Sequence, residues 1–380
     1  MKNSQAMVVF ALVISAIYLV VNYYLFTKGY RLLPNNAVIK FSYSFLFIGL
    51  ASLFLFNRIL LFFPQAPQPA FVFQLGGGWL AAVLYFLLVI LFFNIVQFLD
   101  RFWHFLPDLR VYKFYVLLSA IAFVAVVLTI GFLNATNPTV NKFAVVVGKE
   151  SGVKELKIMQ VSDVHFGNVI GTTEILKMLE IVQKEQPDML LFTGDFIDEG
   201  LTPAMVNAVK PFFDRLHVPY GKIAVLGNHE YINNLAHTVP VFKQLGITLL
   251  QDSVLVIPET CIVAGRDDYS SQSFGGTKRK PTATLLADAD KSLPIILLDH
   301  QPHNLNESVT NGIDLHLSGH THHGQLFPLN LLTSSLFELS WGYRQKGKTH
   351  FYVSSGFGTW GPRIRIGNRA EVVLITMSFE

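Results

Sequence analysis

Five short motifs, each placed directly after a run of apolar residues, constrain the fold of the C-terminal two-thirds of this chain. The runs are rich in leucine and β-branched residues, which predicts buried strands; they read LKIMQV, DMLLFT, KIAVL, PIILL and IDLHLS. The motifs that follow them are Asp163-Val164-His165, Gly194-Asp195, Gly227-Asn228-His229-Glu230, Asp299-His300 and Gly319-His320-Thr321-His322. Strand ends are where an open α/β sheet gathers side chains from distant parts of a chain. We therefore expect these motifs to line one crevice.

The motifs supply carboxylates, imidazoles and one amide. This mixture of oxygen and nitrogen ligands suits Mn, Fe or Zn better than Ca or Mg alone. Each motif is a weak signal when taken singly, although Gly-Asn-His-Glu and Gly-His-Thr-His are rarer than the others. Five of them in order, each at a predicted strand end, indicate a metal site.

The rest of residues 136–380 alternates apolar strands with helical patterns and becomes β-rich toward its end. FAVVV and LKIMQV, on either side of GKESG, predict a hairpin or two adjacent strands. ITLL, VLVI and CIVAG, between residues 246 and 265, predict a local meander. Together these patterns favour an α/β domain with a mixed sheet, either single or doubled.

The N-terminal third has a different character, because it contains four apolar stretches long enough to span a membrane. They cover about residues 7–26, 41–63, 71–98 and 114–134. The first is too long for a signal-peptide core and lacks a small-residue cleavage site, so we expect a retained helix. The chain is 51% hydrophobic and only 14% charged, which agrees with a membrane protein. We predict a transmembrane domain over 1–135 and a second domain over 136–380.

Lysine and arginine in the short loops predict the orientation of these helices. The 27–40 and 99–113 loops hold six basic residues, namely Lys28, Arg31, Lys40, Arg101, Arg110 and Lys113. The opposite side holds Lys2, Arg58 and the uncharged loop FPQAPQP. This bias places both loops in the cytoplasm, so we expect a multi-pass protein of the cell membrane with an extracytoplasmic C-terminal domain.

Charge and cysteine content exclude some classes of partner and linkage. Residues 1–135 carry eight basic and two acidic side chains, which leaves 21 basic (29 − 8) and 24 acidic (26 − 2) for 136–380, a net charge of −3. A mildly acidic domain argues against nucleic acid as a partner. Cys261 is the one cysteine and cannot form an internal disulfide.

Taken together, the motifs resemble the signature of the calcineurin-like metallophosphoesterase superfamily, D-x-H, G-D-x-x-D, G-N-H-E, H and G-H-x-H. The resemblance covers about residues 140–380. GHTHHGQLFP and the tail GFGTWGPRIRIGNRAEVVLIT are similar to a bacterial, membrane-anchored cell-envelope branch. The resemblance implies two mixed sheets packed face to face and flanked by helices.

The resemblance also implies a dinuclear site. One metal would take Asp163, His165, Asp195 and His322, and the other Asp195, Asn228, His300 and His320. Asp195 then bridges two ions about 3.5–4 Å apart, which clamp an in-line displacement at phosphorus by a metal-generated hydroxide. His229 is left for the reaction itself, either to stabilise charge or to protonate the leaving oxygen.

Two further residues are expected near the ligands. Asp198 completes G-D-x-x-D and is expected to orient a ligand, because the outer partners of metal-bound histidines are commonly carboxylates. His323 stands where that branch most often has Gly; it either packs, reaches the substrate or competes as a ligand. Residues 326–343 are apolar and aromatic, so they either fold onto the core or lie on the bilayer.

The leading hypothesis is a membrane-anchored phosphoesterase, a phosphatase or phosphodiesterase, acting on phosphate esters, with lipid-linked phosphates in the cell envelope as the candidate substrates. A rival hypothesis is a UDP-acylsugar pyrophosphatase, which needs a cytoplasmic active site. A catalytically silent sensor or scaffold is a rival of another class, but all seven implied ligands are present. A transporter is disfavoured because the apolar stretches lack the acidic or lysine residues of a coupling-ion path. Four helices also leave oligomerisation open.

Overall fold

The computed structural model describes residues 2–60, 69–105 and 109–380, and the chain divides into two compact units. One unit comprises Met1–Phe132 together with Gly361–Arg363, and the other Leu133–Trp360 together with Ile364–Glu380. Most of the uncharged loop FPQAPQP falls in residues 61–68, outside the described residues.

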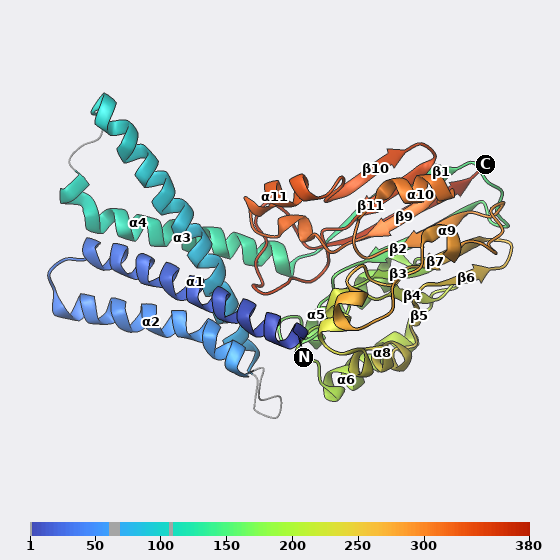
Figure 1. Cartoon of the computed structure of the whole chain (residues 1–380), viewed down its shortest axis with the longest axis horizontal. Helices are drawn as coiled ribbons and strands as arrows, with labels where there is room; N and C mark the ends of the chain where they lie inside the picture. The colour runs from blue at the N-terminus through green and yellow to red at the C-terminus, as the bar shows by residue number, and fades with distance from the viewer. Residues whose placement is uncertain (1, 61–68, 106–108) are drawn as a thin grey trace. The chain divides into compact units, whose positions relative to one another are not determined.

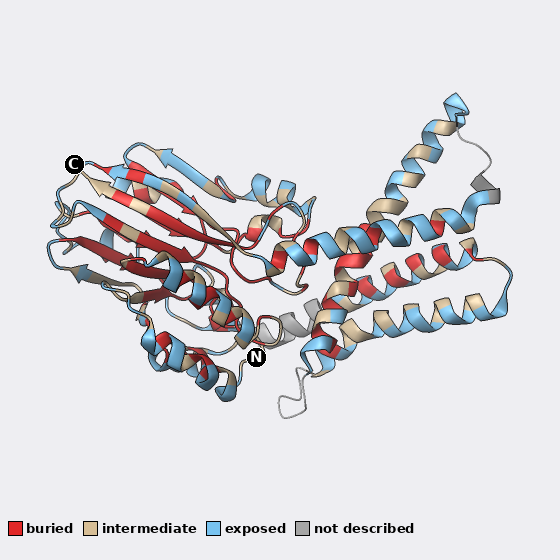
Figure 2. Cartoon of the chain, turned by 180° about the vertical axis from the view of Figure 1, so that it is seen from behind, coloured by how far each residue is buried: buried red, intermediate tan, exposed pale blue. Residues whose placement is uncertain are grey.

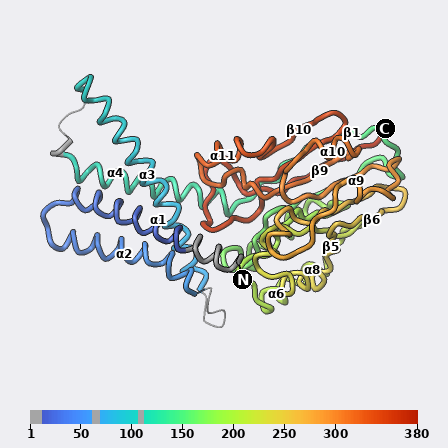
Figure 3. Tube along the Cα trace, in the orientation of Figure 1, coloured from blue at the N-terminus to red at the C-terminus, as the bar shows by residue number. Residues whose placement is uncertain are grey.

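The helical unit contains four long apolar helices, in agreement with the sequence (Figure 1). They are α1 (Lys2–Leu32), α2 (Ala37–Leu60), α3 (Ala70–Trp103) and α4 (Leu109–Thr136), and each is long and apolar enough to cross a membrane. Contacts join α1, α2 and α3 to one another, and α1 and α2 run side by side (Figure 3).

Amide side chains link the first three helices. The Trp79 indole N–H donates to Asn22 Oδ1 at 2.9 Å, and Asn57 Nδ2 donates to the Val72 carbonyl at 3.0 Å. Among the described residues of this unit, the buried polar side chains are these two amides. Neither amide can carry a proton or pair with an ion as a carboxylate would.

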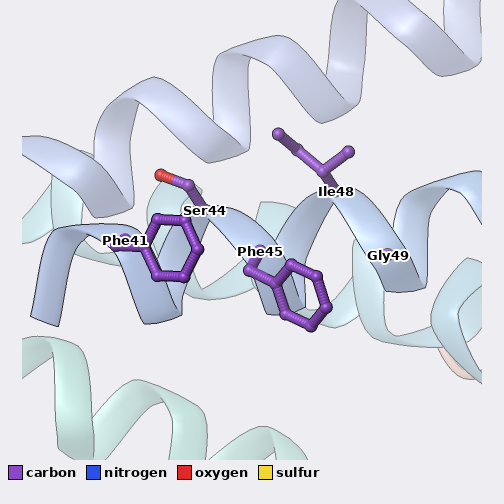
Figure 4. A pocket seen from close by; sticks show the side chains of 5 residues that line it. All are labelled: Phe41, Ser44, Phe45, Ile48 and Gly49. Atoms are coloured by element: carbon purple, nitrogen blue, oxygen red, sulfur yellow. The ribbon is translucent and has the colours of Figure 1, made fainter. Parts of the chain in front are cut away.

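A cavity of about 370 Å³ on α2 is lined by Phe41, Ser44, Phe45, Ile48 and Gly49 (Figure 4). Its lining contains no charged or metal-binding side chain. The lining is apolar apart from Ser44, whose hydroxyl donates to the Lys40 carbonyl at 2.8 Å.

The second unit is built on two six-stranded mixed sheets. The first has the order β1-β12-β2-β3-β4-β5, and the second β10-β11-β9-β8-β7-β6. The first sheet comprises β1 (Thr139–Val147), β12 (Glu371–Phe379), β2 (Glu155–Val161), β3 (Met189–Thr193), β4 (Lys222–Val225) and β5 (Thr248–Leu250). The second comprises β10 (Gly342–Lys346), β11 (Thr349–Val353), β9 (Leu315–Ser318), β8 (Ile295–Leu298), β7 (Cys261–Gly265) and β6 (Ser253–Ile257).

A shared apolar core holds the two sheets face to face, as predicted. Side chains of both sheets, among them Ile158, Leu191, Val263 and Leu298, form one buried cluster. Figure 2 shows the strands of this unit as its most buried part. At about 25 cal/mol per Å² of buried apolar surface, such a layer is the main stabilising contribution to the unit.

Helices cover the outer faces of the sheets. The first sheet is covered by α5 (Thr172–Glu185), α6 (Pro203–Arg215) and α8 (Leu235–Gln244), which bury their apolar stripes against β2, β3 and β4. On the second sheet lie α9 (Thr282–Leu285) and α10 (Leu305–Asn311). The remaining elements are α7 (Asn228–Ile232), α11 (Leu329–Leu336) and the 3₁₀ turns η1 (Ser271–Phe274) and η2 (His322–Gly324).

Two expectations about strand pairing were wrong. β1 and β2 are not neighbours, because β12 inserts between them, parallel to β1 and antiparallel to β2. The stretch 246–265 is not one meander either, because β5 ends the first sheet while β6 and β7 form a hairpin at the edge of the second. In both cases the pairing partner comes from a distant part of the chain, which local periodicity does not encode.

Candidate metal centre

The five motifs lie at the carboxyl ends of five strands, three from the first sheet and two from the second. Asp163 follows β2, Asp195 follows β3 and Asn228 follows β4, whereas His300 follows β8 and His320 follows β9. The face-to-face packing of the sheets therefore brings the motifs together at one shared edge.

The chain turns sharply where the ligand residues stand. Asp163, His165, Asp195, His320 and His322 all adopt positive φ, between 46° and 70°. This left-handed region is uncommon for residues with a side chain, although aspartate and histidine tolerate it best. Such strain persists only where the surroundings fix it, and it clusters at functional sites.

Glycines make room for these turns. Gly194 has φ +86°, and a Cβ there would collide with the ring of His300. A Cβ at Gly227 would collide with the Asp195 carboxylate. Each glycine therefore lets a neighbouring motif approach closely.

One group of side chains consists of Asp163, His165 and His322, whose ligand atoms lie within 4.8 Å of one another. His165 Nε2 lies 3.1 Å from His322 Nε2, and His322 Nε2 lies 3.3 Å from Asp163 Oδ1. The backbone N–H of His320 donates to Asp163 Oδ1 at 3.0 Å. That bond holds the carboxylate toward the two imidazoles.

A second group consists of Asp195, His300 and His320. His300 Nε2 lies 3.1 Å from Asp195 Oδ2, and its Nδ1 lies 2.8 Å from the carbonyl oxygen of Thr193. That carbonyl can only accept, so Nδ1 carries a proton and Nε2 is the nitrogen that faces Asp195. Burial alone would lower the pKa of His300, but the neighbouring Asp195 carboxylate raises it well above its usual value. Asp195 also meets His165 and His229 in a third group, and it is therefore shared between the two halves of the site.

Burial disfavours the charged form of several groups in the site. Burial raises the pKa of Asp163 above its usual value. Burial lowers the pKa of His320 to about 3 and that of His322 well below its ordinary value. Both imidazoles are therefore neutral, the form that binds a metal.

The residues present fit a pair of divalent cations. Asn228 Oδ1 is buried without a hydrogen-bond partner, whereas His300 Nε2 faces the Asp195 carboxylate. A buried, unpartnered oxygen in the turn that also carries His229 offers a lone pair that a cation would engage.

Asp198 lies between two histidines. Its Oδ2 is 3.1 Å from His165 Nδ1, and its Oδ1 is 3.0 Å from His229 Nδ1. Burial alone would raise the pKa of Asp198, but the hydrogen bonds to these imidazoles lower it below its usual value. One carboxylate therefore orients both rings and leaves both Nε2 atoms for the site.

His323 packs away from the ligand groups. Its ring contacts Trp341 at a centroid distance of 4.9 Å, and its backbone N–H donates to Thr321 Oγ1 at 3.1 Å. Of the three roles left open for His323, namely packing, contact with substrate and metal binding, this geometry favours packing.

Glu230 is a residue whose role the sequence did not indicate. Its buried carboxylate accepts from the backbone N–H groups of Asp195, Ile197 and Gly227, at 2.7–3.1 Å. It thereby ties the turn after β3 to the turn after β4. The spacing of Gly227 and Glu230 is that of a capping box, a signal that could have indicated this bond.

Arg365 was also not singled out from the sequence. This fully buried guanidinium donates from NH2 to the carbonyl oxygens of Ser355, Gly356 and Gly358, and NH2 lies 3.4 Å from His322 Nδ1. The tail glycines pack in turn against the Asp163–Val164 turn. Arg365 therefore holds the tail against two ligand-bearing turns.

The sequence model of the calcineurin-like phosphoesterase family matches residues 156–324. An Aquifex aeolicus protein named "Uncharacterized metallophosphoesterase" is 32% identical over 241 residues, which cover 63% of this chain and 91% of that protein. The chain belongs to the calcineurin-like metallophosphoesterases.

Membership of this family makes the chain a hydrolase of phosphoric ester bonds, in a family that uses two metal ions. A Helicobacter pylori metallophosphoesterase is 32% identical over 59% of this chain and 60% of its own length. A Danio rerio protein named "Transmembrane protein with metallophosphoesterase domain" is 29% identical over 68% of this chain and 62% of its own length. The alignments thus span only about 60% of these two relatives. The four apolar helices here agree with membrane anchoring of this metallophosphoesterase.

Proposed function

We propose that this metallophosphoesterase hydrolyses a phosphate ester at a dinuclear centre bridged by Asp195. The observation that carries the proposal is the position of Asp195, which belongs both to the group around His165 and to the group around His300 and His320. In this assignment Asp163, His165 and His322 hold one ion. Asn228, His300 and His320 hold the other.

Two ions bound there supply Lewis-acid polarisation of the phosphoryl oxygens and acidify a water at neutral pH. Residues of the chain place and deliver the proton that the leaving oxygen needs. His229 stands next to ligand Asn228, and Asp198 fixes its Nδ1, so its Nε2 is held in place. We assign to Nε2 the delivery of a proton to the leaving oxygen.

We further propose that the ester is lipid-linked and that the second unit faces the extracytoplasmic side of the cell membrane. The six basic residues of the 27–40 and 99–113 loops support this orientation. The chain between α4 and β1 is two residues long, so a short connection joins the second unit to a helix that can cross a membrane. The net charge of −3 over 136–380 agrees with a substrate other than nucleic acid.

The test is turnover of the full chain in lipid nanodiscs, with added Mn, Fe or Zn, on lipid phosphates, soluble monoesters, diesters and nucleotide sugars. Asp195→Asn should abolish turnover and reduce bound metal at both positions, because Asp195 alone touches both groups. Asp214→Asn, at an exposed carboxylate of α6, is the control and should change neither. Near-normal turnover with two bound metals in Asp195→Asn would exclude the bridging assignment.

A further inference from the structure

Helix α11 (Leu329–Leu336) presents its apolar side chains to solvent. Leu329, Leu331, Leu332 and Leu336 are 40%, 63%, 55% and 67% exposed, and no residue of the helix is buried. The neighbouring Phe327 and Trp341 are 48% and 41% exposed. We call these six side chains the α11 apolar face.

A helix on the surface of a soluble domain normally turns its apolar stripe toward the core. In α11 the leucines face solvent instead. Its least exposed residues are the polar Asn330 and Thr333. Ser334 Oγ lies 3.2 Å from Ser340 Oγ, so polar contacts fix the helix to the unit. Large apolar side chains that gather at the surface over one short segment are typical of an interaction site.

The α11 apolar face begins beside the metal centre. Phe337 directly follows the helix, and its ring centroid lies 6.2 Å from that of His320 and 5.2 Å from that of His303. At the other end, η2 carries His322 and contacts α11. Whatever covers this face is therefore held next to the ligand residues.

The bilayer is the partner that fits this surface. The chain has four helices that can cross a membrane, and only two residues separate Thr136 at the end of α4 from Thr139 at the start of β1. A lipid surface is thus always within reach of the unit. Residues 326–348 also carry three basic side chains, Arg344, Lys346 and Lys348, against the single acid Glu338, a net charge of +2. Leucine, tryptophan and basic residues together are typical of segments that lie in the membrane interface.

We propose that α11 inserts its leucines into the interfacial layer of the bilayer and presents a lipid-borne phosphate to the metal centre. The substrate part of this inference rests on the proposed function, whereas the insertion does not. A second copy of the chain and the chain's own helices are the competing occupants of the α11 apolar face.

Insertion is tested by a depth measurement on the full chain in vesicles of neutral and anionic phospholipid. Cys261→Ser removes the native cysteine, and Leu332→Cys then carries a fluorophore. The matched control is Val256→Cys, at a 54% exposed position on β6. Nitroxide-bearing lipids should quench the label at position 332 and leave the label at 256 bright. Equal quenching at both positions would overturn the proposal. It would also be overturned if quenching at position 332 depended on the amount of protein per lipid and not on the fraction of nitroxide lipid.

Presentation of the lipid substrate is tested with a combined variant, Leu331→Ser, Leu332→Ser and Leu336→Ser. Hydrolysis of phosphatidate in vesicles should fall about tenfold or more, the change that about 1.4 kcal/mol of lost interaction produces. Hydrolysis of soluble nitrophenyl phosphate should stay within about twofold, because the three leucines are exposed and none of them is assigned as a metal ligand. Phe212→Ser, at an exposed position on α6, should change neither rate.

The two measurements separate the two proposals. A wild-type chain that hydrolyses no ester would contradict the proposed function, and the depth measurement would still decide the insertion. Equal losses on vesicle and soluble substrates would overturn the role of α11 in presentation.

Discussion

Asp195 and Asp198 stand three residues apart and act on different parts of the site. Asp195 faces the ligand groups, while Asp198 bonds to the far side of two imidazoles. The pKa of Asp195 would be raised by burial, yet the neighbouring His300 and His229 lower it well below its usual value. At the residue scale, the G-D-x-x-D motif thus combines an ionised carboxylate shared by two candidate ligand groups with a carboxylate that orients two imidazoles.

Replacing His229 tests its role as an acid. His229→Ala should keep two metals per chain, because its partner Asp198 and its neighbour Asn228 remain. Turnover should fall by about 10²–10⁴-fold, the usual contribution of general acid–base catalysis. The loss should shrink for esters of good leaving groups such as nitrophenol, which need little protonation.

Metal analysis and leaving-group dependence together decide this assignment. Loss of a metal in His229→Ala would make His229 a ligand, a role that its proximity to His165 and Asp195 permits. An equal loss for good and poor leaving groups would instead favour charge stabilisation at the phosphoryl oxygens.

Replacing Arg365 tests a positioning role. Arg365→Lys keeps the charge but loses the planar fork, in which one nitrogen faces three carbonyl oxygens and the other donates to Asn368 Oδ1 at 3.1 Å. Metal affinity should fall by about 10–100-fold, as for other residues that orient ligands. Arg369→Lys, at an exposed neighbour in the same tail, should bind metal normally. Thermal unfolding separates the two effects, since normal affinity in a destabilised Arg365→Lys chain would make the role structural only.

At the element scale, the location of the site at the strand ends could be predicted from the sequence. The backbone conformation and hydrogen bonds of the site could not. Buried strands are short continuous apolar runs, so the positions of Asp195 and His300 at strand ends follow from the sequence. The positive φ of Asp163, which accepts from His320 N–H, and the approach of Arg365 to His322 involve neighbours from distant segments. The same holds for β12, because no local sequence pattern predicts that it lies between β1 and β2.

A buried histidine in the second sheet should make the stability of the folded chain sensitive to acid. His316 in β9 is buried between the hydroxyls of Ser308 and Ser318, and burial lowers its pKa to about 4 from 6.5. Between these pH values the unfolded chain binds a proton that the folded chain does not, so stability should fall as pH falls through this window.

The measurement is the midpoint of thermal unfolding of the full chain in detergent, at fixed metal, between pH 7 and pH 4.5. His316→Gln should lose less stability over this range than the wild type. His237→Gln, at an exposed histidine of α8, should follow the wild type. Parallel curves for His316→Gln and the wild type would remove His316 as the cause.

At the scale of the whole molecule, the orientation of the helices decides which substrates can reach the site. Nucleotide-linked lipids are made and cleaved where nucleotides are present, in the cytoplasm, whereas other lipid phosphates are also found on the outer side. The same metal centre would therefore serve different substrates on the two sides. The bias in basic residues, six in the 27–40 and 99–113 loops against Lys2 and Arg58, predicts the extracytoplasmic side.

Reporter fusions test that orientation. A reporter that is active only outside the cytoplasm, fused after Glu380, should be active, and tags in the loops around Lys28 and Arg110 should be accessible only from the cytoplasm. Replacing the six basic loop residues by glutamine should weaken or invert this pattern, because the orientation depends on lysine and arginine near the helix ends. Glutamine at Lys142 and Lys149 is the matched control; it should change nothing, because both belong to a long domain that crosses largely regardless of charge. The reverse pattern in the wild type would place the metal centre in the cytoplasm and make a UDP-acylsugar the better candidate substrate.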